Sequence, residues 1–282
     1  MTDRTELRRV LAPALVALLA MGCGGGDGGG SSSGGDSGGG AAVENPVDAA
    51  TAGNITGSIV FEGDAPVMDA IDMSDEQVCA DKHSSTPMIQ EVSVSDGMLA
   101  NVFVYVKEGL ETLQFPTPGA VLLNQDGCVY LPHVLGVMAG QDITIRNSDG
   151  LLHNINASPD INRGFNSSQP VNMETTRSFG AAEVMVPLRC DVHGWMNAYV
   201  GVLDHPYHSV SNSNGAFSLS TLPPGDYVIE AWHERYGTQT QNVTVTTGET
   251  AEVTFTFSPS MARNALVPLD APIDLHEIVE AS

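Results

Sequence analysis

Residues 183–203 read EVMVPLRCDVHGWMNAYVGVL, and the seven residues CDVHGWM (190–196) at its centre raise the question of a metal site. Apolar residues alternate on both sides of this heptapeptide, which predicts two strands, because successive side chains of a strand point to opposite faces. A tight loop between the strands brings Cys190, His193 and Met196 close together. Their thiolate, imidazole and thioether groups are ligands for soft metals such as copper.

A second stretch supplies another imidazole. Residues 142–157, DITIRNSDGLLHNINA, predict a strand, a polar turn and a new strand that begins at His153. A thiolate and two imidazoles in a plane, with a weak thioether contact, select copper and hold Cu(I) and Cu(II) in nearly one geometry. A lone Cys or Met is more often part of a core. The prediction of a metal site therefore depends on all four residues together.

The fold class follows from the chain beyond residue 55. Short runs of Val, Ile, Thr, Phe and Tyr alternate with clusters of Gly, Pro, Asn and Asp, and only the last dozen residues hint at a helical period. Strands at regular spacing over some 200 residues predict an all-β fold of one or two β-sandwiches. Residues 67–98 show little alternation and are expected to be irregular.

The two stretches around the predicted ligands resemble the cupredoxins, which are small blue-copper proteins with a Greek-key β-sandwich. In that family the first histidine ligand lies in an N-x-D…H-N context, here Asn147, Asp149, His153 and Asn154. The other three ligands share one loop, and the C-x2-H-x2-M spacing is similar to that of amicyanin, whose loop is the shortest in the family. The resemblance covers about residues 118–205 and places a cupredoxin-like copper domain at 116–205.

The resemblance implies one type 1 copper ion as cofactor, with His153, Cys190, His193 and Met196 as its ligands. It also implies that His193 is the more exposed ligand, through which electrons pass, and that backbone near Asn154 hydrogen-bonds to the Cys190 sulfur. A dinuclear copper site needs two Cys in the loop, a multicopper oxidase needs His-x-His pairs, and a structural zinc site needs more Cys or His. A nucleophilic Cys190 with His193 as its base is the remaining alternative, and the Met and the context of His153 speak against it.

The region from residue 211 to 257 resembles another family, the carboxypeptidase regulatory-like or transthyretin-like sandwich. It contains a D/N-G-x-F hairpin, with Gly215 and Phe217, and an L-P-P-G-x-Y turn, with Gly225 and Tyr227. The two glycines are expected to supply turn dihedrals and the two aromatic residues to enter the core. The resemblance implies a rigid spacer or binding platform without catalytic residues.

The opening strands of this second sandwich are missing just before residue 207. Matching sequences occur far upstream, as NITGSIVFEGDAP (54–66) and ANVFVYVK (100–107). We therefore expect the copper domain to be inserted between the second and third strands of a sandwich made of residues 53–115 and 206–260, followed by a tail at 261–282. Two sandwiches in series are the alternative.

The N-terminus predicts export and anchoring. Residues 1–22 have a basic start and a short apolar run, which is typical of a signal peptide. The run ends in Gly22-Cys23, which resembles the lipobox of bacterial lipoproteins, although Ala20 stands where the pattern favours Leu. Cys23 is thus expected to carry lipid, and residues 23–52, rich in Gly and Ser, to act as a flexible tether. A plain secretion signal is the alternative.

The remaining cysteines fit an oxidising compartment. Cys79, Cys128 and Cys190 are an odd number, which indicates one disulfide and one thiol with another purpose. With Cys190 assigned to copper, Cys79 and Cys128 are expected to form the disulfide. The alternative is a second metal site formed by these two cysteines with His83 and His133.

Together these features predict a membrane-tethered electron carrier and not an enzyme. The chain has 34 acidic and 11 basic residues, a net charge of −23, so its surface repels nucleic acid and favours redox protein partners with basic docking surfaces. The expected location is the bacterial cell envelope, lipid-anchored and facing the periplasm or the outside. The alternative is a non-redox envelope module that stores or delivers copper or adheres to glycans.

Overall fold

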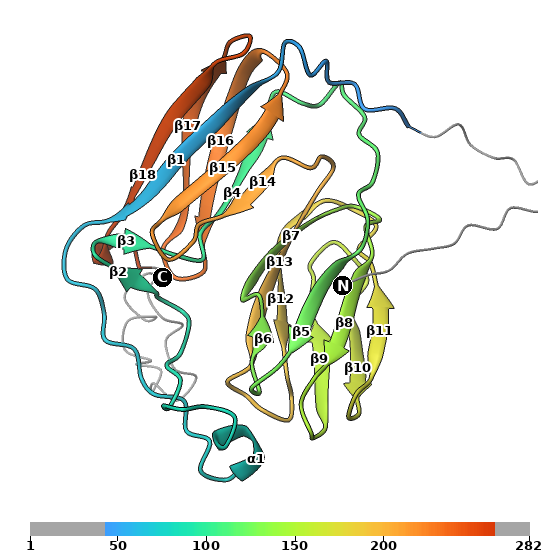
Figure 1. Ribbon diagram of the computed structural model, residues 1–282, viewed down its shortest axis with the longest axis vertical. Coiled ribbons are helices and arrows are strands. Elements are labelled where there is room, and N and C mark those ends of the chain that lie inside the picture. Colours follow the sequence, from blue (N-terminus) through green and yellow to red (C-terminus); the bar gives the residue numbers. More distant parts are fainter. Residues whose placement is uncertain (1–42, 263–282) are drawn as a thin grey trace, which may run out of the picture. The chain divides into compact units, whose positions relative to one another are not determined.

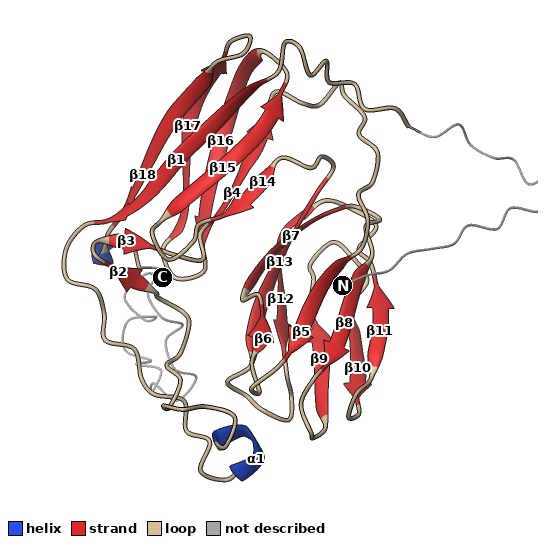
Figure 2. Cartoon of the chain, in the orientation of Figure 1, coloured by secondary structure: helices blue, strands red, loops and turns tan. Residues whose placement is uncertain are grey.

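The computed structural model describes residues 43–262, and Figure 1 follows the chain through them. Strands dominate this part of the chain (Figure 2), where the helical elements are the single-turn helix α1 (Gln77–Ala80) and the 3₁₀ turn η1 (Pro259–Met261). The strands form four sheets. The protein is therefore nearly all-β, as the runs of β-branched and aromatic residues predict, because such side chains pack well on a pleated sheet.

Two of the sheets form a sandwich that we call the split sandwich. In one sheet, β1 pairs with three neighbours, and the strands are β1 (Gly53–Phe61), β2 (Val94–Ser95), β3 (Met98–Leu99), β15 (Ala216–Leu222) and β18 (Thr250–Phe257). The other sheet has the order β14-β4-β16-β17, with the strands β4 (Phe103–Glu108), β14 (His208–Val210), β16 (Gly225–His233) and β17 (Gly237–Val245). Inward-facing residues of both sheets form one core, which includes Ile55, Val104, Ile229 and Phe255.

The split sandwich is built from two distant parts of the chain. Asn54–Phe61 of β1 runs parallel to Thr250–Phe257 of β18, and β1 also pairs with β15 in the antiparallel sense. Likewise, β4 lies between β14 and β16. A separate sandwich forms from the chain between β4 and β14. The strands of the split sandwich therefore come from both sides of the stretch that forms the separate sandwich.

The inserted sandwich also consists of two sheets. One has the order β10-β9-β12-β13-β7, with β7 (Val134–Met138), β9 (His153–Ala157), β10 (Phe165–Gln169), β12 (Glu183–Arg189) and β13 (Asn197–Leu203). The other has the order β11-β8-β5-β6, with β5 (Val121–Gln125), β6 (Tyr130–Leu131), β8 (Ile143–Asn147) and β11 (Glu174–Arg177). Its core is a second buried cluster, which includes Leu123, Ile145, Ile155 and Val200.

The irregular connection between β1 and β2 differs from expectation in one respect. The sequence assigned it to the split sandwich, as part of residues 53–115. In the structure, Ile71, Met73 and Cys79 belong to the buried cluster of the inserted sandwich. The reason is covalent, since a disulfide joins Cys79 to Cys128 of that sandwich. We call residues 71–83 the tethered segment.

The turn residues of the split sandwich agree with expectation in part. Gly215 has a φ of 68°, and Phe217 and Tyr227 are buried, as the hairpin and turn motifs predict. Gly225, expected to supply a special turn dihedral, does not have a positive φ, whereas Thr221 has a φ of 61°. The strained position of this turn is therefore at Thr221, just before the LPPG sequence.

Two histidines at and just before β14, His205 and His208, are partly buried. The His205 ring nitrogen Nε2 lies 2.8 Å from the carbonyl oxygen of Val106, and the His208 ring stacks on Phe103 with 5.6 Å between centroids. Burial lowers the pKa of His205, and it lowers the pKa of His208 to about 4, with a further contribution from the charge of His205.

The anchoring predictions fall outside the described residues. Cys23, the signal peptide at 1–22, most of the tether and residues 263–282 of the tail lie in the ranges that the structure does not describe. Within residues 43–262, no helix is long and apolar enough to cross a membrane.

Candidate metal centre

The loop between β12 and β13 is closed by hydrogen bonds between its own ends. Cys190 N donates to the Met196 carbonyl oxygen at 3.0 Å, and Met196 N donates to the His193 carbonyl oxygen at 2.9 Å. Cys190 and Met196 both belong to the buried cluster of the inserted sandwich, and His193 is 1% exposed. The short loop thus holds three potential ligand side chains at the buried end of the sheet.

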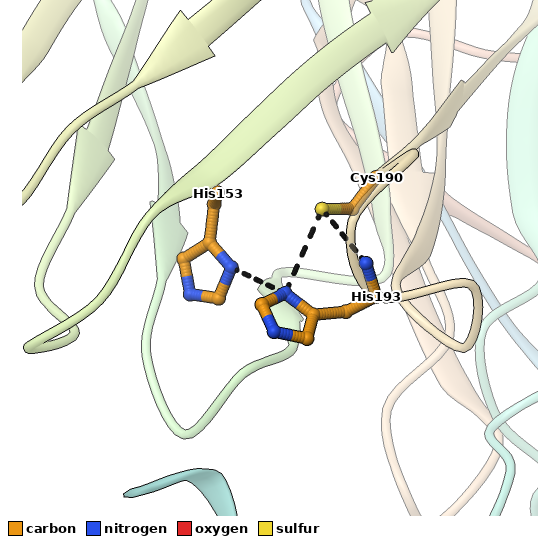
Figure 3. A group of neighbouring side chains, drawn as sticks. All are labelled: His153, Cys190 and His193. Atoms are coloured by element: carbon orange, nitrogen blue, oxygen red, sulfur yellow. Dashed lines mark hydrogen bonds between the residues drawn. The ribbon is translucent and has the colours of Figure 1, made fainter. Parts of the chain in front are cut away.

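The first residue of β9 meets two of these side chains. His153, Cys190 and His193 each offer one potential ligand atom, and these atoms lie within 4.8 Å of one another. Figure 3 shows the arrangement: the two Nδ1 atoms are 2.9 Å apart, and the Cys190 Sγ is 3.8 Å from the His193 Nδ1. One sulfur and two imidazole nitrogens therefore converge from two separate strand ends.

Asp149 orients the His153 ring from the opposite side. Its Oδ2 accepts a hydrogen bond from the His153 Nε2 at 2.8 Å, and both side chains are fully buried. This bond places the ring proton on Nε2 and leaves the Nδ1 lone pair facing Cys190 and His193. A carboxylate that holds the far nitrogen of a ligand histidine is a recurrent feature of metal sites, where it fixes the tautomer and strengthens the donor.

The donor set fits a copper ion of the kind that the sequence predicts. His153 and His193 both present Nδ1 to the same space, and the Nε2 of His193 is buried without a hydrogen-bond partner. Two imidazoles and one thiolate in a buried site are the equatorial ligands of a type 1 copper centre. A bound copper ion would supply one-electron redox chemistry at this point.

Burial, charges and hydrogen bonds shift the pKa values of Cys190, His153 and His193 in different directions. Burial acts to raise the pKa of Cys190, but the His153 side chain and backbone N–H groups, including those of Asn154 and His193, outweigh it and lower that pKa. Burial acts to lower the pKa of His153, but the hydrogen bond to Asp149 acts against it, and the pKa is raised. Burial and the charge of His153 lower the pKa of His193. A thiolate and a neutral His193 ring are the forms that bind a metal.

Asn154 shapes the surroundings of the sulfur. Its side-chain Oδ1 accepts hydrogen bonds from the backbone N–H of Asp191 at 2.6 Å and of Val192 at 3.3 Å, and it lies 3.3 Å from the Cys190 Sγ. The backbone N–H of His193 also donates to this sulfur at 3.4 Å. The sequence predicted only a backbone contact near Asn154, whereas the side chain is the group that holds the loop.

Met196 is placed on the ligand loop as expected. Its side chain is 1% exposed and packs in the same cluster as Cys190. Trp195, the neighbouring residue, packs its ring 5.1 Å from the His193 ring and donates from Nε1 to the Cys128 carbonyl oxygen. Trp195 therefore supports the site by packing. The role of Met196 as axial ligand stays a prediction.

The predicted exposure of His193 is wrong. The residue is 1% exposed, so its ring is not an open port for electrons. The rings of His153 and Trp195 pack against it, with centroids 4.7 and 5.1 Å away. The Glu76 carboxylate of the tethered segment is close enough to act on the pKa of His193. The spacing of the sequence motif could not reveal this, because burial depends on how these rings pack in the fold.

The two remaining cysteines are joined to each other. The Cys79–Cys128 disulfide spans 49 residues of sequence and uses both sulfurs, which removes them as thiolate ligands. His83 instead lies 2.7 Å from the Gly127 carbonyl oxygen, and His133 contacts Glu234 and the carbonyl oxygen of Asn197. The structure thus contains the expected pair and not the alternative of two cysteines and two histidines around a second metal.

A match to a family model crosses the boundary between the two sandwiches. Residues 195–258 match the family model described as "Carboxypeptidase regulatory-like domain". The match begins inside the ligand loop and includes β13, which pairs with β7 and β12 of the inserted sandwich. In the split sandwich the strand beside β15 is β1, from far upstream. The search of curated proteins returned no match.

Similar solved structures include copper proteins. A purple cupredoxin from Nitrosopumilus maritimus is 20% identical, with 30% of this chain and 99% of that chain covered and a TM-score of 0.26. An amicyanin mutant in a Cu(I) form is 18% identical (30% and 82% covered, TM-score 0.28). A copper-containing nitrite reductase from Thermus scotoductus is 18% identical (36% and 25% covered, TM-score 0.28). The donor set in the structure, and not these likenesses, is the reason for considering copper here.

Proposed function

We propose that this protein is a type 1 copper protein that carries single electrons. The observation that carries the proposal is the convergence of the Cys190 sulfur with the Nδ1 atoms of His153 and His193 in a buried site. A trigonal set of one thiolate and two imidazoles with a weak axial thioether, from Met196, suits both copper oxidation states. Little reorganisation is then needed when an electron arrives or leaves.

The protein would carry electrons without turning over a substrate. His153, Cys190, His193 and Met196 would together occupy the coordination positions of the metal and leave none open for a substrate. A catalytic metal site usually keeps such an open position, as zinc enzymes illustrate.

The setting that we propose is the bacterial cell envelope. A lipid on Cys23 would hold the protein at a membrane, and the tether would let the folded part move above it. The net charge of −23 favours redox partners with basic docking surfaces, because opposite charges steer two proteins together. These parts of the proposal rest on the sequence.

A visible spectrum tests the copper assignment. Residues 43–282 are produced, loaded with one equivalent of Cu(II), and recorded before and after reduction and reoxidation. We expect an intense absorption band toward the red end, which reduction bleaches and oxidation restores. A protein that stores or delivers copper without redox cycling would bind the metal tightly without the reversible band, and a protein that binds no copper would overturn the proposal.

A further inference from the structure

The tethered segment (residues 71–83) brings a lysine to the metal centre from outside the inserted sandwich. Lys82 Nζ lies 2.7 Å from the Asp149 Oδ1, and Asp149 is fully buried. The other oxygen of the same carboxylate accepts the hydrogen bond from the His153 Nε2. One carboxylate thus joins an ammonium group on one side to a candidate copper ligand on the other.

The Asp149 carboxylate is fixed in place by hydrogen bonds on both of its oxygens. Its Oδ1 accepts from the backbone N–H of Gly127 at 2.8 Å, and its Oδ2 accepts from that of Cys128 at 2.9 Å. With Lys82 and His153 added, each oxygen has two hydrogen-bonding partners. A carboxylate held in this way cannot rotate away, so a change at Lys82 is felt directly at His153.

Three contacts keep Lys82 in place. The Cys79–Cys128 disulfide fixes the segment three residues before it, and the His83 ring lies 2.7 Å from the Gly127 carbonyl oxygen one residue after it. The backbone N–H of Lys82 also donates to the Cys79 carbonyl oxygen. The lysine side chain is 29% exposed, so it reaches from the solvent edge to a buried carboxylate.

We propose that Lys82 is a positioning residue for the metal centre and that, through Asp149, it sets how strongly His153 donates to copper and therefore the reduction potential. This inference rests on the copper function proposed above. A carboxylate that accepts from a ligand imidazole makes the imidazole a stronger donor, which stabilises Cu(II). The ammonium group draws part of the negative charge of that carboxylate toward itself and limits the effect. The tethered segment thereby acts on the copper site as well as packing against the inserted sandwich.

The proposal predicts shifts of opposite sign for the two members of the pair. In Lys82→Gln a positive charge near the metal is lost and Asp149 becomes a stronger acceptor for His153, so the reduction potential falls. In Asp149→Asn a negative charge is lost and the acceptor is weaker, so the potential rises. Lys82→Arg keeps the charge and should restore most of the original value. Each variant is titrated with redox mediators while the red absorption is followed.

Asp126 offers a matched control. Its Oδ1 lies 3.5 Å from the same Lys82 Nζ, but this carboxylate is 53% exposed and has no contact with His153. Asp126→Asn should therefore leave the potential close to that of the parent protein. If Lys82 only neutralises a buried carboxylate, Lys82→Gln lowers the thermal midpoint but shifts the potential no more than Asp126→Asn, and the inference is overturned.

A second readout does not depend on the potential. In the diamagnetic Cu(I) form, the proton on the His153 Nε2 reports the strength of its hydrogen bond by nuclear magnetic resonance. We expect its resonance to move downfield in Lys82→Gln and to stay in place in Asp126→Asn; an unmoved resonance in Lys82→Gln overturns the inference. A protein that takes up no copper overturns the proposed function and this inference together, whereas a blue protein with an unchanged potential overturns this inference alone.

Discussion

The Nδ1 atoms of His153 and His193 lie 2.9 Å apart, although 40 residues separate them in the chain. At this distance one of the two nitrogens must carry a proton, because two lone pairs facing each other repel. Asp149 draws the ring proton of His153 to Nε2, so in the absence of metal the proton between the two Nδ1 atoms belongs to His193, whose neutral ring then donates from Nδ1 to His153. A metal ion that accepts both lone pairs would replace this proton, which is why the arrangement fits a cation.

Replacing the sulfur tests the origin of the predicted colour. In Cys190→Ser the thiolate is lost, and with it the charge transfer from sulfur to Cu(II), so the intense red absorption should disappear even where copper still binds. Absorption spectra at equal copper content measure the effect. Met196→Leu is the matched loop variant and should keep the band. A Cys190→Ser protein that stays blue would contradict the assignment of Cys190 as a ligand.

Met196→Leu should also change the reduction potential. In Met196→Leu a weak axial donor is replaced by an apolar side chain of similar size, which should disturb the core little. Loss of this donor disfavours Cu(II) more than Cu(I), so we expect a higher reduction potential with the band retained. Redox titration measures the shift. An unchanged potential would show that Met196 is a core residue and not a ligand.

The sequence brings the candidate ligand residues to attention because their spacing is local. Cys190, His193 and Met196 share one loop, and His153 begins a strand that the alternation of apolar residues reveals. The pairing of β1 with β18 was also foreseeable, since the opening strand motif was absent from the later region. Both predictions depend on patterns that lie within short windows of sequence.

The features that the sequence could not predict depend on long-range contacts. No motif marks Lys82, because its role comes from a disulfide that connects an irregular segment to another sandwich. The burial of His193 was not visible either, because it depends on how the rings of His153 and Trp195 pack against it in the fold. For Asp149, the i,i+4 spacing to His153 was visible, but its four hydrogen-bonding partners come from separate parts of the fold.

The anchor prediction concerns Cys23. If the basic start, apolar run and Gly/Ser tether make this chain a lipoprotein, Cys23→Ala should move the protein from the membrane fraction to the soluble fraction. Immunodetection after fractionation of cells measures the change, with Cys190→Ser as a cysteine variant that should stay with the membrane. A Cys23→Ala protein that still fractionates with membranes would require another means of attachment.

The split sandwich should lose stability in acid because of His208. Its folded pKa is about 4, against an ordinary value of 6.5, because the ring is buried. As the pH falls below about 6.5, the unfolded chain binds a proton that the folded protein does not, so the free energy of unfolding falls until about pH 4, by at most about 3 kcal/mol. Denaturant titrations at several pH values measure this slope. His208→Asn should flatten it, and a slope equal to that of the parent would contradict the prediction.

The last prediction concerns the strand that closes the split sandwich. Gly57 of β1 lies between β15 and β18, where an added Cβ would come within 2.1 Å of the Val253 carbonyl oxygen and 2.4 Å of the Phe217 ring. Backbone on one side and a buried ring on the other cannot move aside cheaply. We therefore expect Gly57→Ala to lower the free energy of unfolding by about 1–3 kcal/mol or more.

Gly180→Ala is the control for this change, because a Cβ at Gly180 has no atom within 4 Å and the residue does not have a positive φ. Denaturant unfolding of both variants gives the comparison, and Gly180→Ala should be nearly neutral. The metal site lies in the other sandwich, so copper-loaded Gly57→Ala should keep the absorption band while it remains folded. Equal stability of the two variants would mean that β1 is not packed between β15 and β18, and the inserted arrangement of the copper sandwich would then be wrong.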